Sequence, residues 1–188
     1  VLFGAIFTNN ILLTNFLGMC SFLAISKEVK SAVGLGAAVV FVMTMVNAIE
    51  WPVYYYVLVP LNLTYLGYIV YIIIIAAAVQ LVEMVVERVS EPLYNALGIF
   101  LPLITVNCAV FGAVLFMIIR KYTFLASVAY GLGGGLGWML AIVAMAGIRA
   151  KMAKAKVPRG LEGPGIALII TGIMALAFMG FSGMMPAS

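Results

Sequence analysis

The sequence contains no histidine, little charge and only two cysteines. The absence of histidine excludes histidine-ligated haem, histidine proton relays and zinc sites with histidine ligands from this chain. Charged residues make up 9% of the 188 residues and hydrophobic residues 66%, whereas a soluble domain is about 25% charged and about half apolar. We therefore expect an integral membrane protein with a single membrane domain over residues 1–188 and no separate soluble catalytic domain.

Six apolar stretches are long enough to cross a bilayer, because a membrane-spanning helix needs about 20 apolar residues. They cover residues 1–25, 32–49, 65–86, 93–119, 124–148 and 165–184. The first stretch lacks a basic segment and an Ala-x-Ala cleavage site, so we expect it to belong to the mature protein rather than to a signal peptide. Most Lys and Arg residues fall in the first, third and fifth loops. Basic loops stay in the cytoplasm, so both chain termini are expected on the outer side of the membrane.

The fifth loop, residues 149–164, is strongly basic. We interpret it mainly as a topology signal, and contact with anionic lipid or an acidic partner is the alternative. Membrane lipid is therefore an expected neighbour of the chain, and nucleic acid is not an expected partner.

The two halves of the chain share a sequence pattern. Residues 14–24 carry Cys20 and residues 102–112 carry Cys108, each within an apolar stretch. After a short charged loop, Ser31-Ala-Val-Gly-Leu-Gly opens the second stretch and Ser127-Val-Ala-Tyr-Gly-Leu-Gly opens the fifth. Because each half has three spans, the second half would enter the membrane upside down. We predict an all-α fold of two inverted three-helix repeats, approximately residues 1–92 and 93–188, with a functional site near the midplane.

The first and fourth stretches have the composition of broken helices. The first contains Asn9, Asn10, Thr14, Asn15 and Gly18, and the fourth contains Gly98, Pro102, Thr105 and Asn107. Proline removes a backbone donor and bends a helix. Irregular backbone at membrane depth must be buried in protein, where Asn and Thr side chains can bond it. The alternative is that these residues lie in ordinary membrane helices, in which Gly and Pro are common.

Glycine is concentrated in the fifth stretch at positions 131, 133, 134, 135 and 137. The cluster does not favour a phosphate-binding loop, because it lies in an apolar span and lacks the Lys-Ser/Thr ending. The spacing of Gly133 and Gly137 instead predicts close packing of this helix against a neighbour.

Cys20 and Cys108 are the candidate metal ligands of this chain. Iron–sulfur clusters take Cys thiolates, commonly four, so a complete cluster would need two more from another subunit. The alternative is that each cysteine serves only as a small apolar residue.

Two acidic residues lie in or beside apolar stretches. Glu83 follows Gln80 by about one turn near the inner end of the third stretch. Intramembrane acids tend to mark ion paths, although Glu83 could also lie close enough to the interface to reach water. Glu50, with Asn47 one turn earlier, ends the second stretch and is expected in the outer headgroup region.

Three segments resemble the small membrane subunits of bacterial Rnf complexes and of the sodium-pumping NADH:quinone oxidoreductase (Nqr). They are LGMCSFLAISK at 17–27, LGIFLPLITVNCA at 97–109 and GFSG at 180–183. The segment PLNLTY at 60–65 is similar to the RnfA branch of this family. The segments GWMLAIVA at 137–144 and AGIR at 146–149 are similar to the NqrE branch. We favour RnfA, with NqrE as the alternative.

The resemblance implies an electron-transfer site. Family members pair with a homologous sister subunit of opposite orientation, and the two together hold an intramembrane [2Fe–2S] cluster. Each of the pair gives two cysteines, which map onto Cys20 and Cys108 here. The family's acid in the pattern Gln-x-x-Glu-Met, proposed to take part in sodium uptake, maps onto Glu83.

The leading hypothesis is an electron-carrying subunit of an Na⁺- or H⁺-translocating oxidoreductase in the bacterial or archaeal inner membrane. The chain would not be catalytic alone and would work with other redox subunits. A second hypothesis is an inverted-repeat secondary transporter that uses Glu83 and the broken helices without redox chemistry. A third is a structural scaffold, in which neither cysteine has a chemical role.

Overall fold

The fold is known from a computed structural model, which describes residues 2–89, 101–154 and 163–181. Throughout these ranges the regular structure is helical, as the composition predicted. The elements are η1 (Gly4–Thr8), α1 (Met19–Ile25), α2 (Val29–Val53), η2 (Tyr54–Leu58), η3 (Thr64–Leu66), α3 (Gly67–Val89), α5 (Leu101–Thr105), α6 (Cys108–Ile119), α7 (Phe124–Met152) and α8 (Pro164–Met179). Here η1 and η2 are π-helical turns and η3 is a 3₁₀ turn.

Four helical segments of the described chain are long and apolar enough to cross a membrane. They are Val29–Leu58, Thr64–Arg88, Pro102–Ile119 and Phe124–Met152. The expected first span is instead divided between η1 and α1, and α8 has 16 residues. Residues 93–100 of the expected fourth span, 155–162 of the basic loop and 182–184 of the sixth span lie outside the described residues. The number of six spans and the repeat boundary at residue 92 therefore stay predictions.

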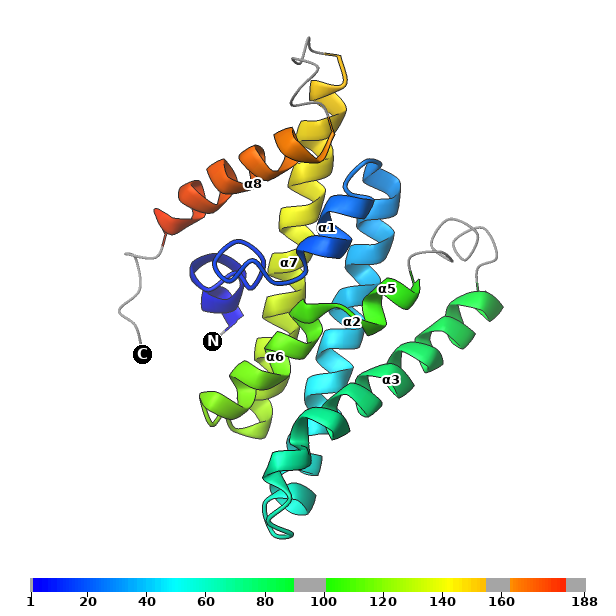
Figure 1. Cartoon of the computed structure of the whole chain (residues 1–188), viewed down its shortest axis with the longest axis vertical. Coiled ribbons are helices and arrows are strands. Elements are labelled where there is room, and N and C mark those ends of the chain that lie inside the picture. The colour runs from blue at the N-terminus through cyan, green and yellow to red at the C-terminus, as the bar shows by residue number, and fades with distance from the viewer. Residues whose placement is uncertain (1, 90–100, 155–162, 182–188) are drawn as a thin grey trace.

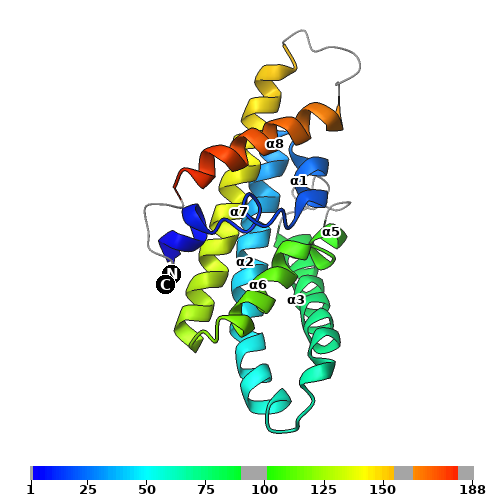
Figure 2. The same cartoon turned by 60° about the vertical axis from the view of Figure 1, so that its left-hand side comes forward.

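Helices α2 and α7 run side by side through the middle of the molecule (Figure 1 and Figure 2). Their close approach depends on glycine. A Cβ atom on Gly135 would lie 2.8 Å from Val40 Cα, and one on Gly131 would lie 2.9 Å from the Met43 carbonyl oxygen. Real Cβ atoms essentially never come this close to another backbone, so larger residues would force the two helices apart.

A second glycine face of α7 receives the N-terminal segment. A Cβ on Gly133 would lie 3.0 Å from the Leu2 carbonyl oxygen, and one on Gly137 would lie 3.0 Å from that of Ile6. The predicted close packing through Gly133 and Gly137 is confirmed, and its partner is the segment that contains η1. Helix α7 therefore supports both α2 and the first broken helix.

The far end of α7 holds α1 in place. The guanidinium of Arg149 donates to the Leu23 carbonyl oxygen at 3.0 Å and to Ser26 Oγ at 2.7 Å. A cation at the C-terminus of a helix binds its free carbonyl groups and favours its negative dipole end. Arg149, assigned to a loop from the sequence, thus lies inside α7 and anchors α1.

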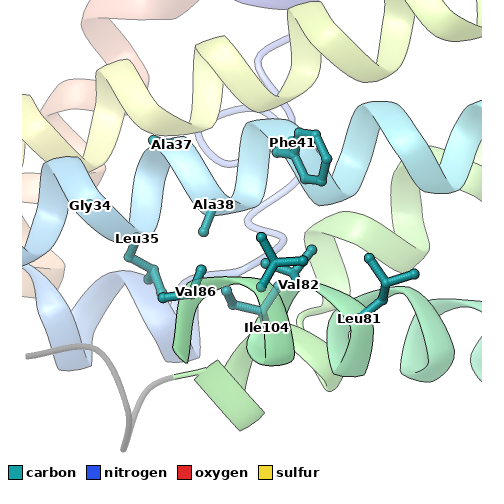
Figure 3. A pocket seen from close by; sticks show the side chains of 10 residues that line it. Gly34, Leu35, Ala37, Ala38, Phe41, Leu81, Val82, Val86 and Ile104 are labelled. Atoms are coloured by element: carbon teal, nitrogen blue, oxygen red, sulfur yellow. The ribbon is translucent and has the colours of Figure 1, made fainter. Parts of the chain in front are cut away.

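An apolar cavity of about 310 Å³ separates α2 from α3 and α5. Figure 3 shows Leu35, Ala38 and Phe41 of α2 facing Val82 and Val86 of α3 across it, with Ile104 of α5 nearby. The cavity follows from the divergence of α3 from α2 toward its C-terminal end (Figure 1).

We predict that Gly137→Ala lowers the thermal unfolding midpoint of the protein in detergent. The new methyl group would press on the backbone of η1, and overpacking of this kind costs about 1–3 kcal/mol. The matched control is Gly147→Ala on the same helix, where an added Cβ meets nothing within 4 Å. An equal unfolding midpoint for the two variants would contradict the close contact between Gly137 and η1.

Candidate metal centre

The first helix break, between Thr8 and Met19, is organised by Asn10. This fully buried side chain accepts hydrogen bonds from the backbone N–H groups of Leu12 (3.1 Å) and Leu13 (3.3 Å). Its Nδ2 donates to the carbonyl oxygens of Ile6 (3.1 Å) and Gly137 (2.8 Å). Backbone groups freed by a break need such partners in an apolar interior. Asn10 therefore makes the break stable and fastens it to α7.

The second break lies between α5 and α6. Helix α5 ends at Thr105, and α6 begins at Cys108 after the N-cap residue Asn107. The Asn107 side chain accepts a hydrogen bond from the N–H of Ala109 at 3.0 Å, which satisfies one free donor of the first turn. The predicted interruptions in both cysteine-bearing stretches are thus observed.

The two breaks meet in the structure. The backbone N–H of Gly18 donates to Sγ of Cys108 at 2.9 Å, although 90 residues separate them in sequence. Cys20 is the second residue of α1 and Cys108 is the first of α6. From this point the two helices run toward opposite ends of the molecule (Figure 1). Cys20 is exposed and Cys108 is half-buried, so the site opens onto the protein surface.

Gly18 is required by the geometry of the meeting point. Its φ angle is 84°, in the left-handed region that favours glycine. A Cβ at this position would lie 2.6 Å from Trp138 Nε1 and 3.0 Å from Ala109 Cβ. The backbone of the first break can therefore reach Cys108 only without a side chain at residue 18.

Two buried hydrogen-bond donors at this site have no acceptor among the described residues. They are Nδ2 of Asn107, which precedes Cys108, and Nε1 of Trp138, which lies against Gly18. An unpaired buried donor costs about 1–3 kcal/mol, so such donors in a native protein usually have a ligand or water to bind. With the Gly18 N–H they make a donor-rich surrounding that fits an anionic, sulfur-ligated group. The sequence did not reveal Trp138, because only the fold brings it to Gly18.

The described residues do not complete a metal site by themselves. No group of three or more His, Cys, Asp or Glu residues is placed to hold a metal ion in that part of the chain. Any metal group bound by Cys20 and Cys108 needs further ligands from elsewhere, and the exposure of Cys20 leaves room for them.

Among the described residues, no hydrogen bond or ion pair joins Glu83 to either cysteine. Glu83 is half-buried on α3. Its neighbours Val82 and Val86 line the apolar cavity beside α2. The structure therefore places Glu83 on a helix that borders a cavity, and Ile104 of α5 lines the same cavity.

The expectation that Glu50 lies in the outer headgroup region stays a prediction, because burial within the protein does not give depth in the membrane. Its side chain is fully buried within the protein rather than facing water. The spacing of Asn47 and Glu50 placed both on one face of α2. The sequence could not show that this face turns inward, because charged residues at the end of an apolar stretch commonly face water.

The fold and the site define a class of molecule: a helical membrane protein with two thiols at adjoining helix breaks. The chain belongs to the family of Rnf-Nqr subunit membrane proteins, whose family model matches residues 1–185.

Two relatives are similar over nearly the whole chain. Both are named as the E subunit of Na(+)-translocating NADH-quinone reductase, one from Aeromonas salmonicida and the other from Aeromonas hydrophila. Each is 55% identical over 189 residues, covering 97% of this chain and 96% of the relative. The resemblance to the family is confirmed, and these relatives carry the name of the NqrE branch rather than of the favoured RnfA branch.

We predict that Gly18→Ala lowers the unfolding midpoint in detergent. The left-handed conformation alone costs a side-chain-bearing residue about 1–2 kcal/mol, and the added methyl group also displaces Trp138. Gly172→Ala on α8, where a Cβ meets nothing within 4 Å, is the matched control. A midpoint for Gly18→Ala as high as that of the control would show that the meeting of the breaks does not need glycine.

Proposed function

We propose that this chain is an electron-carrying membrane subunit of a Na⁺-translocating NADH-quinone reductase, in the role of NqrE, and that it is not catalytic alone. The observation that carries the proposal is the Gly18 N–H to Cys108 Sγ hydrogen bond, which joins the two cysteine-bearing breaks. Family membership and the names of the two Aeromonas proteins support the type of complex. An Rnf-type complex, favoured by residues 60–65, is the alternative within the family.

In this proposal Cys20 and Cys108 bind iron of a [2Fe–2S] cluster, which supplies one-electron transfer when bound. Such clusters commonly take four thiolates, so a homologous sister subunit of opposite orientation supplies the other two. The exposure of Cys20 supports a site shared with a second chain. The remaining redox subunits of the complex would deliver and accept the electron.

The surrounding residues have a defined task. The Gly18 N–H, which bonds Cys108 Sγ, and the unpartnered side-chain donors of Asn107 and Trp138 would stabilise negative charge on a bound cluster. Hydrogen bonds to sulfur are one way in which a protein sets a cluster's reduction potential. Their effect is larger in an apolar interior, where the effective dielectric constant is lower than in water. The donor set thus favours acceptance of an electron at Cys20 and Cys108.

The membrane arrangement is part of the same proposal. The chain crosses the inner membrane six times as two inverted halves, with both termini on the outer side. Each described half contains a broken helix, then a long central helix and then a further helix, which supports this arrangement. The two breaks would then approach the midplane from opposite sides, as in other inverted-repeat membrane proteins.

Ion coupling is assigned to Glu83 and to the charge at the cysteines. An electron that arrives beside Cys20 and Cys108 adds negative charge to a low-dielectric layer and attracts a cation. Glu83 is an intramembrane acid beside an apolar cavity, a position that is typical of ion paths. We propose that Glu83 takes part in sodium uptake.

We predict that Cys20→Ala and Cys108→Ala each abolish the electron paramagnetic resonance signal of the shared cluster and reduce the iron content of the purified complex. Each change removes one of the proposed thiolate ligands. Met19→Leu, next to Cys20 and without a thiol in either form, is the control and should keep the signal. A complex that retains the signal and electron transfer without either cysteine would disprove the ligand assignment.

We predict that Glu83→Gln weakens the stimulation of electron transfer by sodium, because the carboxylate that attracts the cation is lost. The measurement is the rate of quinone reduction by the purified complex as sodium is varied. Glu87→Gln, one turn further along α3 and exposed, should leave the sodium dependence unchanged. Identical sodium dependence in both variants would remove Glu83 from the ion path.

A further inference from the structure

Glu50 is a fully buried carboxyl group without a partner. Neither Oε1 nor Oε2 has a hydrogen bond, and no ion pair reaches this residue in the described part of the chain. An isolated carboxylate in an apolar interior is so unfavourable that it must be neutralised, either by a proton or by a cation.

Asn47 adds a third unpartnered acceptor on the same face of α2. Its Nδ2 donates to the Met43 carbonyl oxygen at 2.8 Å, which identifies Oδ1 as the unpartnered atom of the amide. Residues three apart on a helix are neighbours on its surface. The buried turn from Asn47 to Glu50 therefore presents three oxygen acceptors and no free donor.

The neighbouring helices enclose this turn. On α7, Ser127 Oγ donates to the Asn47 carbonyl oxygen at 3.5 Å, and a Cβ on Gly131 would lie 2.8 Å from Asn47 Nδ2. A side chain at residue 131 would therefore collide with the Asn47 amide. Helix α3 also packs against α2, and its Tyr71 is buried.

Arg120, which contacts the same Tyr122 residue as Trp51, has other partners. Arg120 donates to the Tyr122 hydroxyl at 3.1 Å, and its guanidinium carbon lies 5.8 Å from the centre of the Tyr130 ring. Trp51, which follows Glu50, donates to the Tyr122 carbonyl oxygen at 2.8 Å. Trp and Tyr are enriched at membrane interfaces, so these aromatic residues indicate that Glu50 lies close to one membrane surface.

We propose that Glu50 and Asn47 form a binding site for a monovalent cation of the sodium type. Oxygen atoms of carboxylate and amide groups are the ligands that hard cations prefer. A proton on Glu50 can bridge to only one acceptor, whereas a cation takes several oxygen ligands. One carboxylate balances one positive charge, which favours a monovalent over a divalent ion. The choice of sodium rests on the proposed function in an ion-translocating complex, but the site does not depend on the cluster.

The test measures equilibrium binding of radioactive ²²Na⁺ to the purified complex. Glu50→Gln keeps the size of the side chain and removes its charge, so this complex should bind one Na⁺ fewer than the wild-type complex. Glu87→Gln, which removes an exposed carboxylate from α3, should retain the wild-type number of sites. Both variants should keep the cluster's paramagnetic signal, so loss of sodium binding is distinguishable from failure of the cluster proposal.

Two results would overturn the site. One is ²²Na⁺ binding in Glu50→Gln equal to that of the wild-type complex. The other is an infrared carbonyl band of a protonated carboxylic acid that persists in the sodium-saturated wild-type complex and is lost in Glu50→Gln, which would assign a proton to Glu50.

If Glu50→Gln prevents assembly of the complex, the sodium site is tested with Glu50→Asp instead. The shorter side chain keeps the charge but withdraws the oxygens from Asn47, so the dissociation constant for Na⁺ should rise about tenfold, equivalent to about 1.4 kcal/mol. An unchanged dissociation constant in Glu50→Asp would exclude Glu50 as a ligand.

Discussion

The structure depends on the satisfaction of backbone hydrogen bonds where two helices are interrupted inside an apolar protein. Asn10 supplies four hydrogen bonds at the first break, and Asn107 caps the helix that follows the second. Without these partners, the unpaired backbone N–H and C=O groups would cost too much free energy at membrane depth. Because the breaks are stable, Cys20 and Cys108 lie at the starts of α1 and α6, two helices that run in opposite directions (Figure 1).

Helix α7 contacts α2, the first helix break and the end of α1. Its glycines admit α2 on one side and η1 on the other. Its backbone accepts the hydrogen bond from Asn10, Trp138 lies against Gly18, and Arg149 binds the end of α1. Small residues allow this proximity because association of helices in lipid relies on close packing rather than on a hydrophobic driving force.

The buried side-chain atoms without a hydrogen-bond partner fall into two sets, donors and acceptors. Around Cys108 the unpartnered atoms are donors, on Asn107 and Trp138, whereas around Glu50 they are acceptors, on Glu50 and Asn47. Donors suit negative charge and acceptors suit positive charge. In the function that we propose, the first set would receive an electron and the second a cation, and both sets are placed by contacts between α7 and its neighbours.

The sequence by itself determined the class of fold, the positions of both helix breaks and the packing role of Gly133 and Gly137, because composition and local residue types govern these features. The family also followed from motifs around Cys20 and Cys108. Only the tertiary structure decided that Gly18 reaches Cys108, that Trp138 joins this site and that Glu50 faces inward. Those facts depend on which helix faces meet across long separations in sequence, and a periodic apolar pattern in a nearly uniform hydrophobic chain does not specify the facing partners.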